Sequence, residues 1–186
     1  ASGPLFEWVK KIGRDMSDCG DTTPFQRLLK LARSSGAPAL LAHMNGLSNE
    51  DLKRLQTCRA HFSIAHCPRS HAFFRHPPFR FNDLRAIGVN LCLGTDSLAS
   101  NQNLNMFSEM RKLGKKFPGV PARTVLQMAT RNGAIALGEK GNWPHWADWI
   151  AIPNHGPDPF KTIIAFADSP NFVMISGRIV KKNRLK

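Results

Sequence analysis

The sequence predicts an α/β protein in which a parallel sheet covered by helices is followed by a small antiparallel β unit. Three short apolar runs, each about the length of one strand, are separated by stretches in which apolar residues recur at helical spacing. Continuous apolar strands that alternate with helices are typical of a parallel sheet. Residues 141–186 instead hold strands that lie close together in sequence, as in a β-hairpin.

Two helices are expected before the first strand. Residues 5–12 carry apolar side chains at the spacing of one helix face. For the second helix, Thr23 is a suitable N-cap, Pro24 stands at the first helical position, and Gly36 ends the apolar pattern.

The sheet is expected to form from three strands, at residues 38–43, 62–66 and 89–93. A capping-box pattern at Ser48–Asp51 predicts a helix between the first two strands, and a short helix is expected around residues 81–87. This alternation fits both an open Rossmann-like sheet and a β/α barrel. The chain contains no G-x-G-x-x-G or P-loop motif, so nothing in it supports a nucleotide-binding sheet.

Two longer helices are expected after the third strand, at residues 104–116 and 121–137. The C-terminal unit should then contain three strands, at residues 147–152, 171–175 and 178–181. Ser176-Gly177 forms a fitting two-residue turn between the last two strands. We therefore divide the chain into two parts, residues 1–140 and 141–186.

The composition argues against several classes of protein. No apolar run approaches the roughly 18 residues of a membrane span, so no membrane partner is expected. The net charge of +13 and the pI near 10.3 raise the alternative of a non-catalytic nucleic-acid-binding module. However, only residues 181–186 form a dense basic run, and no aromatic residue interleaves it, so we expect a solvated basic surface. The four cysteines form no C-x-x-C pair, which indicates a reduced, cytoplasmic protein.

Each of the three predicted sheet strands is followed by a side chain that can titrate or bind a metal. His43 ends the first strand, His66 ends the second, and Asp96 follows the third. In a β/α barrel, the carboxyl ends of the strands meet on one face, and that face holds the active site. These three side chains are therefore candidates for one shared site.

The runs around these side chains resemble the amidohydrolase superfamily, and within it the branch of cytosine, guanine and adenosine deaminases and chlorohydrolases. The resemblance rests on residues 41–48 (LAHMNGLS), 65–71 (AHCPRSH) and 93–101 (LGTDSLASN), with support from 105–111 (NMFSEMR) and 128–137 (MATRNGAIAL). The second and third runs look most like adenosine- or aminofutalosine-type deaminases. The resemblance implies that residues 1–140 are the C-terminal portion, about strands six to eight, of a TIM-type barrel. Residues 141–186 would belong to the small flanking β-sandwich.

The resemblance also assigns roles to individual residues. Asp96 would bind a divalent metal, zinc or alternatively iron, and would take a proton from the metal's water. His43 would polarise the substrate or orient the attacking hydroxide. Ser100 would lie near the substrate, and His66 would also belong to the substrate site with a less defined role. Arg69 could bind an anionic group of the substrate or pair with a nearby acid.

The implied reaction is deamination of a small molecule, an adenine-like or other amino-substituted heterocycle or nucleoside, by attack of metal-bound hydroxide. Dechlorination, or cleavage of an amide or ring C–N bond, is the alternative within the family. The family's H-x-H and H-x-x-E motifs are absent from this sequence. About three barrel strands fit before the β unit, whereas a complete barrel takes about 250 residues. We therefore expect a truncated chain that is inactive alone and does not bind metal tightly, from a parent that could form a homodimer.

Four further residues are expected to be exposed to solvent. His71 and His76 lie in a proline-flanked loop and are expected at the surface. Their spacing from His66 and Cys67 fits none of the common structural zinc motifs, so no such site is expected. Glu109 is expected, with Arg111, on a solvated helix face.

Overall fold

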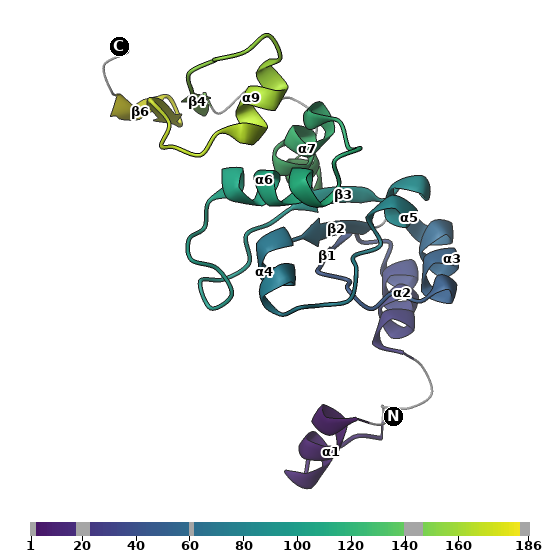
Figure 1. Ribbon diagram of the computed structural model, residues 1–186. Coiled ribbons are helices and arrows are strands. Elements are labelled where there is room, and N and C mark those ends of the chain that lie inside the picture. The colour runs from purple at the N-terminus through teal and green to yellow at the C-terminus, as the bar shows by residue number, and fades with distance from the viewer. Residues whose placement is uncertain (1–2, 18–22, 60–61, 140–146, 183–186) are drawn as a thin grey trace.

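The computed structural model describes residues 3–17, 23–59, 62–139 and 147–182 of the chain (Figure 1). A parallel sheet lies at its centre, with the strand order β1-β2-β3. Its strands are β1 (Ala39–Ala42), β2 (Phe62–His66) and β3 (Asn90–Leu93). The three predicted strands are therefore confirmed, within one residue at either end.

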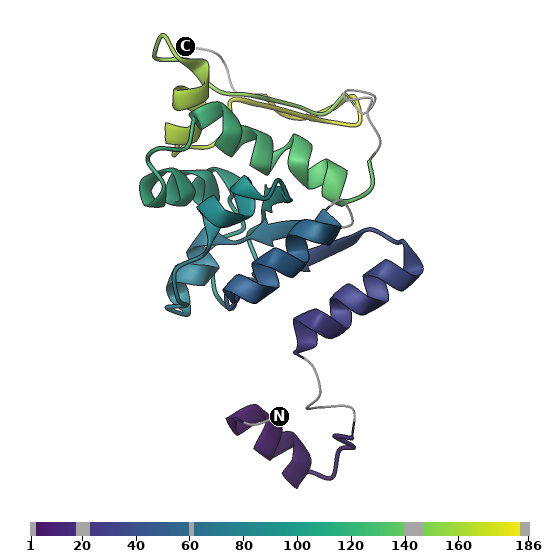
Figure 2. The ribbon, with the colours of Figure 1, turned by 90° about the vertical axis from the view of Figure 1, so that its right-hand side faces the viewer.

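Helices precede, separate and follow the sheet strands, and Figure 2 shows several of them beside the sheet. The helices before β3 are α1 (Pro4–Lys11), α2 (Pro24–Ser35), α3 (Asn49–Cys58), α4 (Pro68–Phe73) and α5 (Phe81–Ala86). Those after it are α6 (Met106–Lys116), α7 (Ala122–Ala129) and α8 (Arg131–Ala136). Both predicted caps are present, because Thr23 caps α2 and Ser48 caps α3, each in a capping box.

Two helical predictions need correction. The single helix expected at residues 121–137 is broken into α7 and α8 at Thr130, whose backbone angles (φ −130°, ψ −92°) are not helical. His71 was expected in a proline-flanked loop but lies in α4, whereas His76 and Pro77-Pro78 lie in the loop after that helix. Pro68 stands at the start of that helix, where proline is tolerated because its missing N–H has no helical partner.

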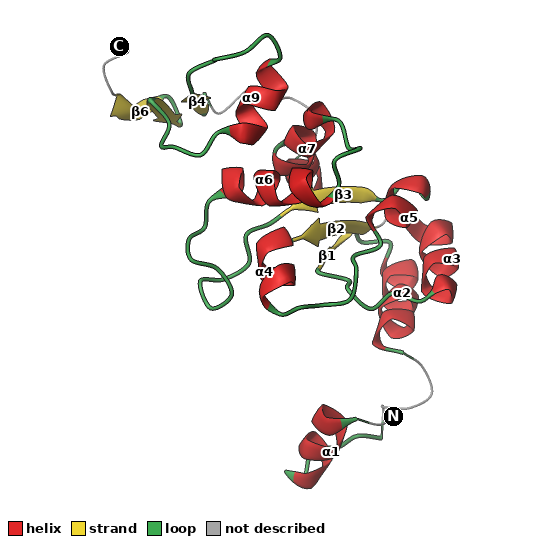
Figure 3. Cartoon of the chain, viewed as in Figure 1, coloured by secondary structure: helices red, strands yellow, loops and turns green. Residues whose placement is uncertain are grey.

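The C-terminal unit is an antiparallel sheet with the order β4-β5-β6 and one additional helix (Figure 3). Its elements are β4 (Trp149–Ala151), α9 (Pro159–Ala165), β5 (Phe172–Ile175) and β6 (Arg178–Lys182). The three strands were predicted and α9 was not. The predicted boundary near Gly141 lies outside the described residues.

The two faces of the parallel sheet differ in burial. Leu41, Ile64 and Leu91 stand side by side across the three strands, and all three belong to the hydrophobic core. On the opposite face, Leu40 lies beside Ser63, and the Leu40 side chain is 43% exposed. Parallel sheets are normally covered on both faces. One face of this sheet is therefore only partly covered by the described residues.

Candidate active site

The carboxyl ends of the three parallel strands bring the predicted residues to one edge of the sheet. The backbone N–H of His43, just after β1, donates to the carbonyl of Ala65 in β2 (2.9 Å). The N–H of Gly94, just after β3, donates to the carbonyl of His66 (3.0 Å). The chain enters the long loop between β3 and α6 from this edge (Figure 3), and Asp96 stands at the start of that loop.

His43 and Asp96 face each other across this edge. The distance from His43 Nε2 to Asp96 Oδ2 is 3.8 Å, and both side chains are partly exposed. Each residue has a left-handed backbone, with φ of 69° for His43 and 58° for Asp96. This conformation is uncommon for residues other than glycine, and it is concentrated at functional sites. The chain thus turns sharply after β1 and after β3, at the two residues that the sequence singled out.

Three donors surround the carboxylate of Asp96. Its Oδ2 accepts hydrogen bonds from the hydroxyls of Ser70 and Ser100, and its Oδ1 accepts one from the backbone N–H of Ser97 (2.8 Å). These bonds, that of Ser70 above all, hold the pKa of Asp96 below its usual value. Asp96 is therefore ionised at neutral pH.

The donor chemistry at this edge fits a divalent metal. A carboxylate offers about four lone-pair positions, of which three are used here, so Asp96 keeps room for one metal bond. Zinc sites commonly have four ligands, including water. Within the described ranges, no group of three or more His, Cys, Asp or Glu side chains is placed to hold a metal. Asp96 is thus suited to be one ligand of a set that these ranges do not complete.

Glu109 forms a buried support beside this carboxylate, so the prediction that it is solvated is wrong. Its side chain is fully buried, because α6 packs that face against α4 and the loop after β3. It accepts hydrogen bonds from the backbone N–H of Arg69 (3.0 Å) and from the amide of Asn101 (3.2 Å). Burial raises the pKa of Glu109, and this effect outweighs the hydrogen bonds and the charge of Arg69.

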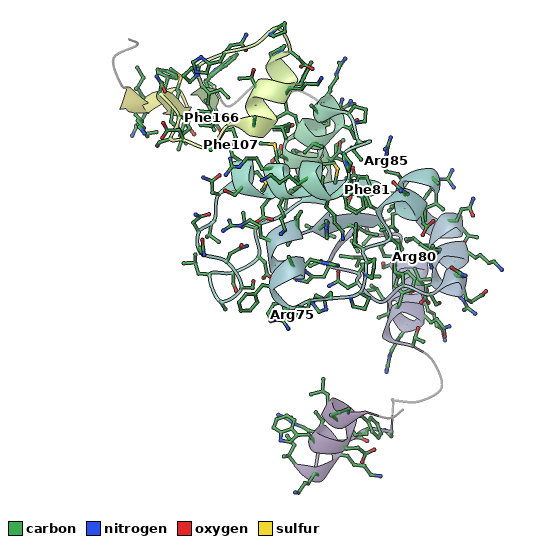
Figure 4. All side chains as sticks on the ribbon, in the orientation of Figure 1. Arg75, Arg80, Phe81, Arg85, Phe107 and Phe166 are labelled. Carbon is green, nitrogen blue, oxygen red and sulfur yellow. The ribbon has the colours of Figure 1, made fainter. Side chains whose placement is uncertain are left out.

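Arg69 pairs with a nearby acid, which was one of the two alternatives predicted for it. Its Nη1 lies 3.7 Å from Glu109 Oε1 and also donates to the side-chain oxygen of Asn103 (2.8 Å). Arg111 is only partly exposed, and its guanidinium donates to Ser108 (2.8 Å) and to the carbonyl of Phe166. Phe166 also packs against Phe107 of α6, with ring centroids 5.0 Å apart (Figure 4). These contacts attach α6 to the C-terminal unit.

His66 is not among the hydrogen-bond partners of Asp96. It lies on the core-facing side of β2, is 3% exposed, and stacks on Phe79 with ring centroids 3.9 Å apart. Burial lowers the pKa of His66 to about 3, with smaller effects from His71 and His43. Its proposed place in the substrate site therefore stays a prediction. His71 is half-buried rather than a surface residue, whereas His76 is exposed as expected.

A cavity of about 740 Å³ opens beside Ser100, the residue that also donates to Asp96. Basic side chains are prominent in its lining: Arg69, Arg111, Lys112 and Lys115. The size is that of a typical small-molecule site. Ser100 therefore lies between a ligand-sized cavity and the candidate metal ligand, and its place near the substrate stays a prediction.

Two members of this site lie in runs that carry the family resemblance, although the sequence did not predict that they belong to the site. Ser70 stands in the AHCPRSH run and donates to Asp96. Glu109 stands in the NMFSEMR run. The only feature of the sequence that pointed to Ser70 and Glu109 was that each lies in a run resembling the amidohydrolase superfamily.

Comparison with known proteins gives a consistent result. A 5-methylthioadenosine/S-adenosylhomocysteine deaminase of Pelotomaculum thermopropionicum is 39% identical over 182 residues, which cover 88% of this chain and 41% of the relative. An aminodeoxyfutalosine deaminase of Deinococcus radiodurans is 32% identical over 127 residues, covering 68% of this chain and 29% of the relative. The chain thus spans less than half the length of either curated relative.

Solved structures and the family model agree with these relatives. A zinc-bound adenosine deaminase from Xanthomonas campestris superposes with a TM-score of 0.67 at 27% identity, covering 84% of this chain and 40% of that one. Among the described residues, no helix has the length and apolar character needed to cross a membrane. The model of the amidohydrolase family matches residues 10–180. The chain therefore belongs to the amidohydrolase family.

Proposed function

We propose that this chain carries the C-terminal part of the active site of a metal-dependent aminohydrolase, with β1, β2 and β3 as strands six to eight of its barrel. The observation that carries the proposal is the approach of His43 Nε2 to within 3.8 Å of Asp96 Oδ2 at the carboxyl edge of a parallel sheet. In β/α barrels this edge is the catalytic one.

Asp96 is proposed to hold the metal and to move a proton. A divalent metal bound there would supply Lewis acidity, which can lower the pKa of water to about 7. Asp96 is ionised at neutral pH, and hydrogen bonds from Ser70 and Ser100 fix its Oδ2. It can therefore accept a proton from the attacking water and return it to the leaving amine.

His43 is proposed to orient the reactants. Its imidazole lies beside Oδ2 of Asp96 and is partly exposed, so it can contact both water and a substrate. In the reaction, the water oxygen bonds to a ring carbon and the exocyclic C–N bond of that carbon breaks. The nitrogen leaves as ammonia with the proton that Asp96 returns.

The proposed substrate class is an adenine-like nucleoside with an exocyclic amino group. Its support is that the two relatives and the structural neighbour are all deaminases. The cavity beside Ser100 has the volume for a ligand of this size. Hydrolysis of a different leaving group is the alternative within the same family.

We also propose that this chain is inactive alone and that further barrel strands supply the remaining metal ligands. Two observations support this. The chain spans 41% of the Pelotomaculum relative, and one face of the parallel sheet leaves Leu40 and Ala42 exposed. Further strands paired at the edges of this sheet would close it into a barrel with the open face inside.

The test begins with the coding sequence upstream of Ala1, in which we expect in-frame H-x-H and H-x-x-E motifs. The protein expressed from its own start codon should release ammonia from adenosine or 5′-methylthioadenosine. Asp96→Asn should lower kcat by about 10²- to 10⁴-fold, since it removes both a metal ligand and a proton acceptor.

Asp83→Asn is the matched control, because Asp83 pairs with Arg80 on α5 and takes no part in the site. It should leave the rate of ammonia release unchanged. The proposal fails if both motifs are missing upstream, or if Asp96→Asn retains the wild-type rate.

A further inference from the structure

Glu109 lies on α6, yet its two carboxylate oxygens contact two other segments of the chain. Its Oε2 accepts a hydrogen bond from the backbone N–H of Arg69 (3.0 Å), at the start of α4. Its Oε1 accepts one from the side-chain amide of Asn101 (3.2 Å), in the loop after β3. The side chain is fully buried, so bulk water does not compete with these donors. Glu109 therefore connects α4 to the loop that carries Asp96.

The Asn101 amide extends this connection to the peptide group in front of Asp96. The same nitrogen, Nδ2, also donates to the carbonyl of Thr95. That carbonyl shares one planar peptide group with the N–H of Asp96, so the bond restrains the backbone where the left-handed turn of Asp96 begins. Such conformations persist only where the surrounding structure over-determines them. Glu109 and Asn101 together supply a restraint of this kind.

The connection to α4 ends at the same carboxylate. Ser70 follows Arg69 in α4, and its hydroxyl donates to Asp96 Oδ2. Arg69 is held a second time, because its Nη1 donates to the side-chain oxygen of Asn103 (2.8 Å) in the loop after β3. The two paths from Glu109 therefore meet at Asp96, one through its backbone and the other through its side chain.

A buried carboxylate is a costly group for a role in stability alone. Its transfer from water carries a desolvation penalty, and apolar side chains of similar volume often stabilise a fold as well or better. What a carboxylate adds is two oxygens that both accept hydrogen bonds. Buried polar networks in which every group is satisfied make the local structure rigid. The chemistry of Glu109 therefore suits the holding of two segments in one arrangement.

We infer that Glu109 is a positioning residue, which holds Asp96 and the Ser70 hydroxyl in the arrangement that the reaction needs. This inference rests on the proposed function of Asp96. Glu109 acts through Arg69 and Asn101, because its two oxygens accept from those residues. A misplacement of about 1 Å can slow an enzyme about 10²-fold, so loss of this support should lower kcat far more than it weakens substrate binding.

The first test follows the local structure of the 186-residue chain by NMR and needs no catalytic activity. Glu109→Gln replaces one accepting oxygen with an amide, so one of the two connections is lost. The backbone amide signal of Ser97 should then shift, although that N–H donates to Asp96 and not to Glu109. Leu52→Ala is the matched control, because it truncates a core side chain of α3 that has no polar atom to join this network. It should leave the Ser97 signal in place.

The second test measures deamination by the protein expressed from its own start codon. Glu109→Gln should lower kcat per folded molecule about 10- to 100-fold and change KM less than about threefold. Asn101→Ala interrupts one of the same paths, so the double variant should lose less than the product of the two single losses. Leu52→Ala should keep the wild-type kcat per folded molecule.

The inference is overturned if Glu109→Gln leaves either the Ser97 signal or kcat unchanged, or if Leu52→Ala has the same effects. It is also overturned if the losses from Glu109→Gln and Asn101→Ala multiply, since the two side chains would then act independently. Failure of the proposed function gives a different result. The wild-type protein then releases no ammonia, whereas the Ser97 signal still decides whether Glu109 positions Asp96.

Discussion

His66 illustrates how one buried side chain can make the stability of the whole chain depend on pH. Its folded-state pKa is about 3, because burial disfavours the imidazolium, whereas an unfolded histidine titrates near 6.5. The unfolded chain therefore binds a proton first as the pH falls. His66 contributes stability above about pH 6.5, and this contribution is lost as the pH falls toward 3.

We predict that the free energy of unfolding falls by about 2 kcal/mol through His66 between pH 7 and pH 5. Urea unfolding at the two pH values measures it. His66→Gln should remove that part of the pH dependence, whereas His76→Gln should retain it because His76 is exposed. Equal pH dependence in wild type and His66→Gln would show that His66 is protonated in the folded chain.

Glu109 gives a second prediction at this scale. Glutamine at this position would present an amide to the N–H of Arg69 and the amide of Asn101, so one donor would lose its acceptor. Glu109→Gln should therefore lower the free energy of unfolding by about 1–3 kcal/mol in urea denaturation. Glu50→Gln removes an exposed pair with Arg54 and should cost less than about 0.5 kcal/mol. Similar losses in the two variants would contradict the buried role of Glu109.

Sequence reasoning found some of these residues and missed the roles of others for a physical reason. His43, His66 and Asp96 follow apolar strands, so local patterns locate them. Ser70 and Glu109 act through contacts between distant positions, 26 residues apart for Ser70 and Asp96 and 40 apart for Arg69 and Glu109. Nothing in the local pattern around either residue reports such a contact.

Strand β1 shows the unequal burial of the two sheet faces at the scale of one element. Leu41 is 8% exposed and belongs to the core, whereas its neighbour Leu40 is 43% exposed on the opposite face. Leu41→Ala should lower the free energy of unfolding by about 2–5 kcal/mol, because it leaves a cavity in the core. Leu40→Ala should cost less than about 1 kcal/mol. Equal losses in chemical denaturation of this chain would mean that both faces are covered.

The elements that the sequence predicted are those with strong local signals. Apolar runs located the three sheet strands, and side-chain caps located the starts of α2 and α3. The break between α7 and α8 has no such signal, because the apolar spacing continues through it. Asn132, two residues after Thr130, donates to the carbonyl of Leu91 in β3 (2.7 Å), a tertiary contact that local spacing does not report.

For the molecule as a whole, charge alone was a poor guide to function. The net charge of +13 permitted a nucleic-acid-binding module. In the described structure, part of that charge lines the cavity beside Ser100. The family resemblance came instead from short motifs around the strand ends where the candidate site lies, and the family model over residues 10–180 confirmed it. The number of barrel strands that this chain supplies stays part of the proposal.

The most direct test of the account asks whether a metal binds at the edge where His43 meets Asp96. Mn²⁺, a paramagnetic divalent ion, is added to the metal-free chain while NMR follows broadening of the backbone signals. The account predicts weak binding that first broadens signals near Asp96, such as those of Ser97 and Ser100, and that disappears in Asp96→Asn. Broadening that is centred elsewhere, or that is unchanged in Asp96→Asn, would contradict it.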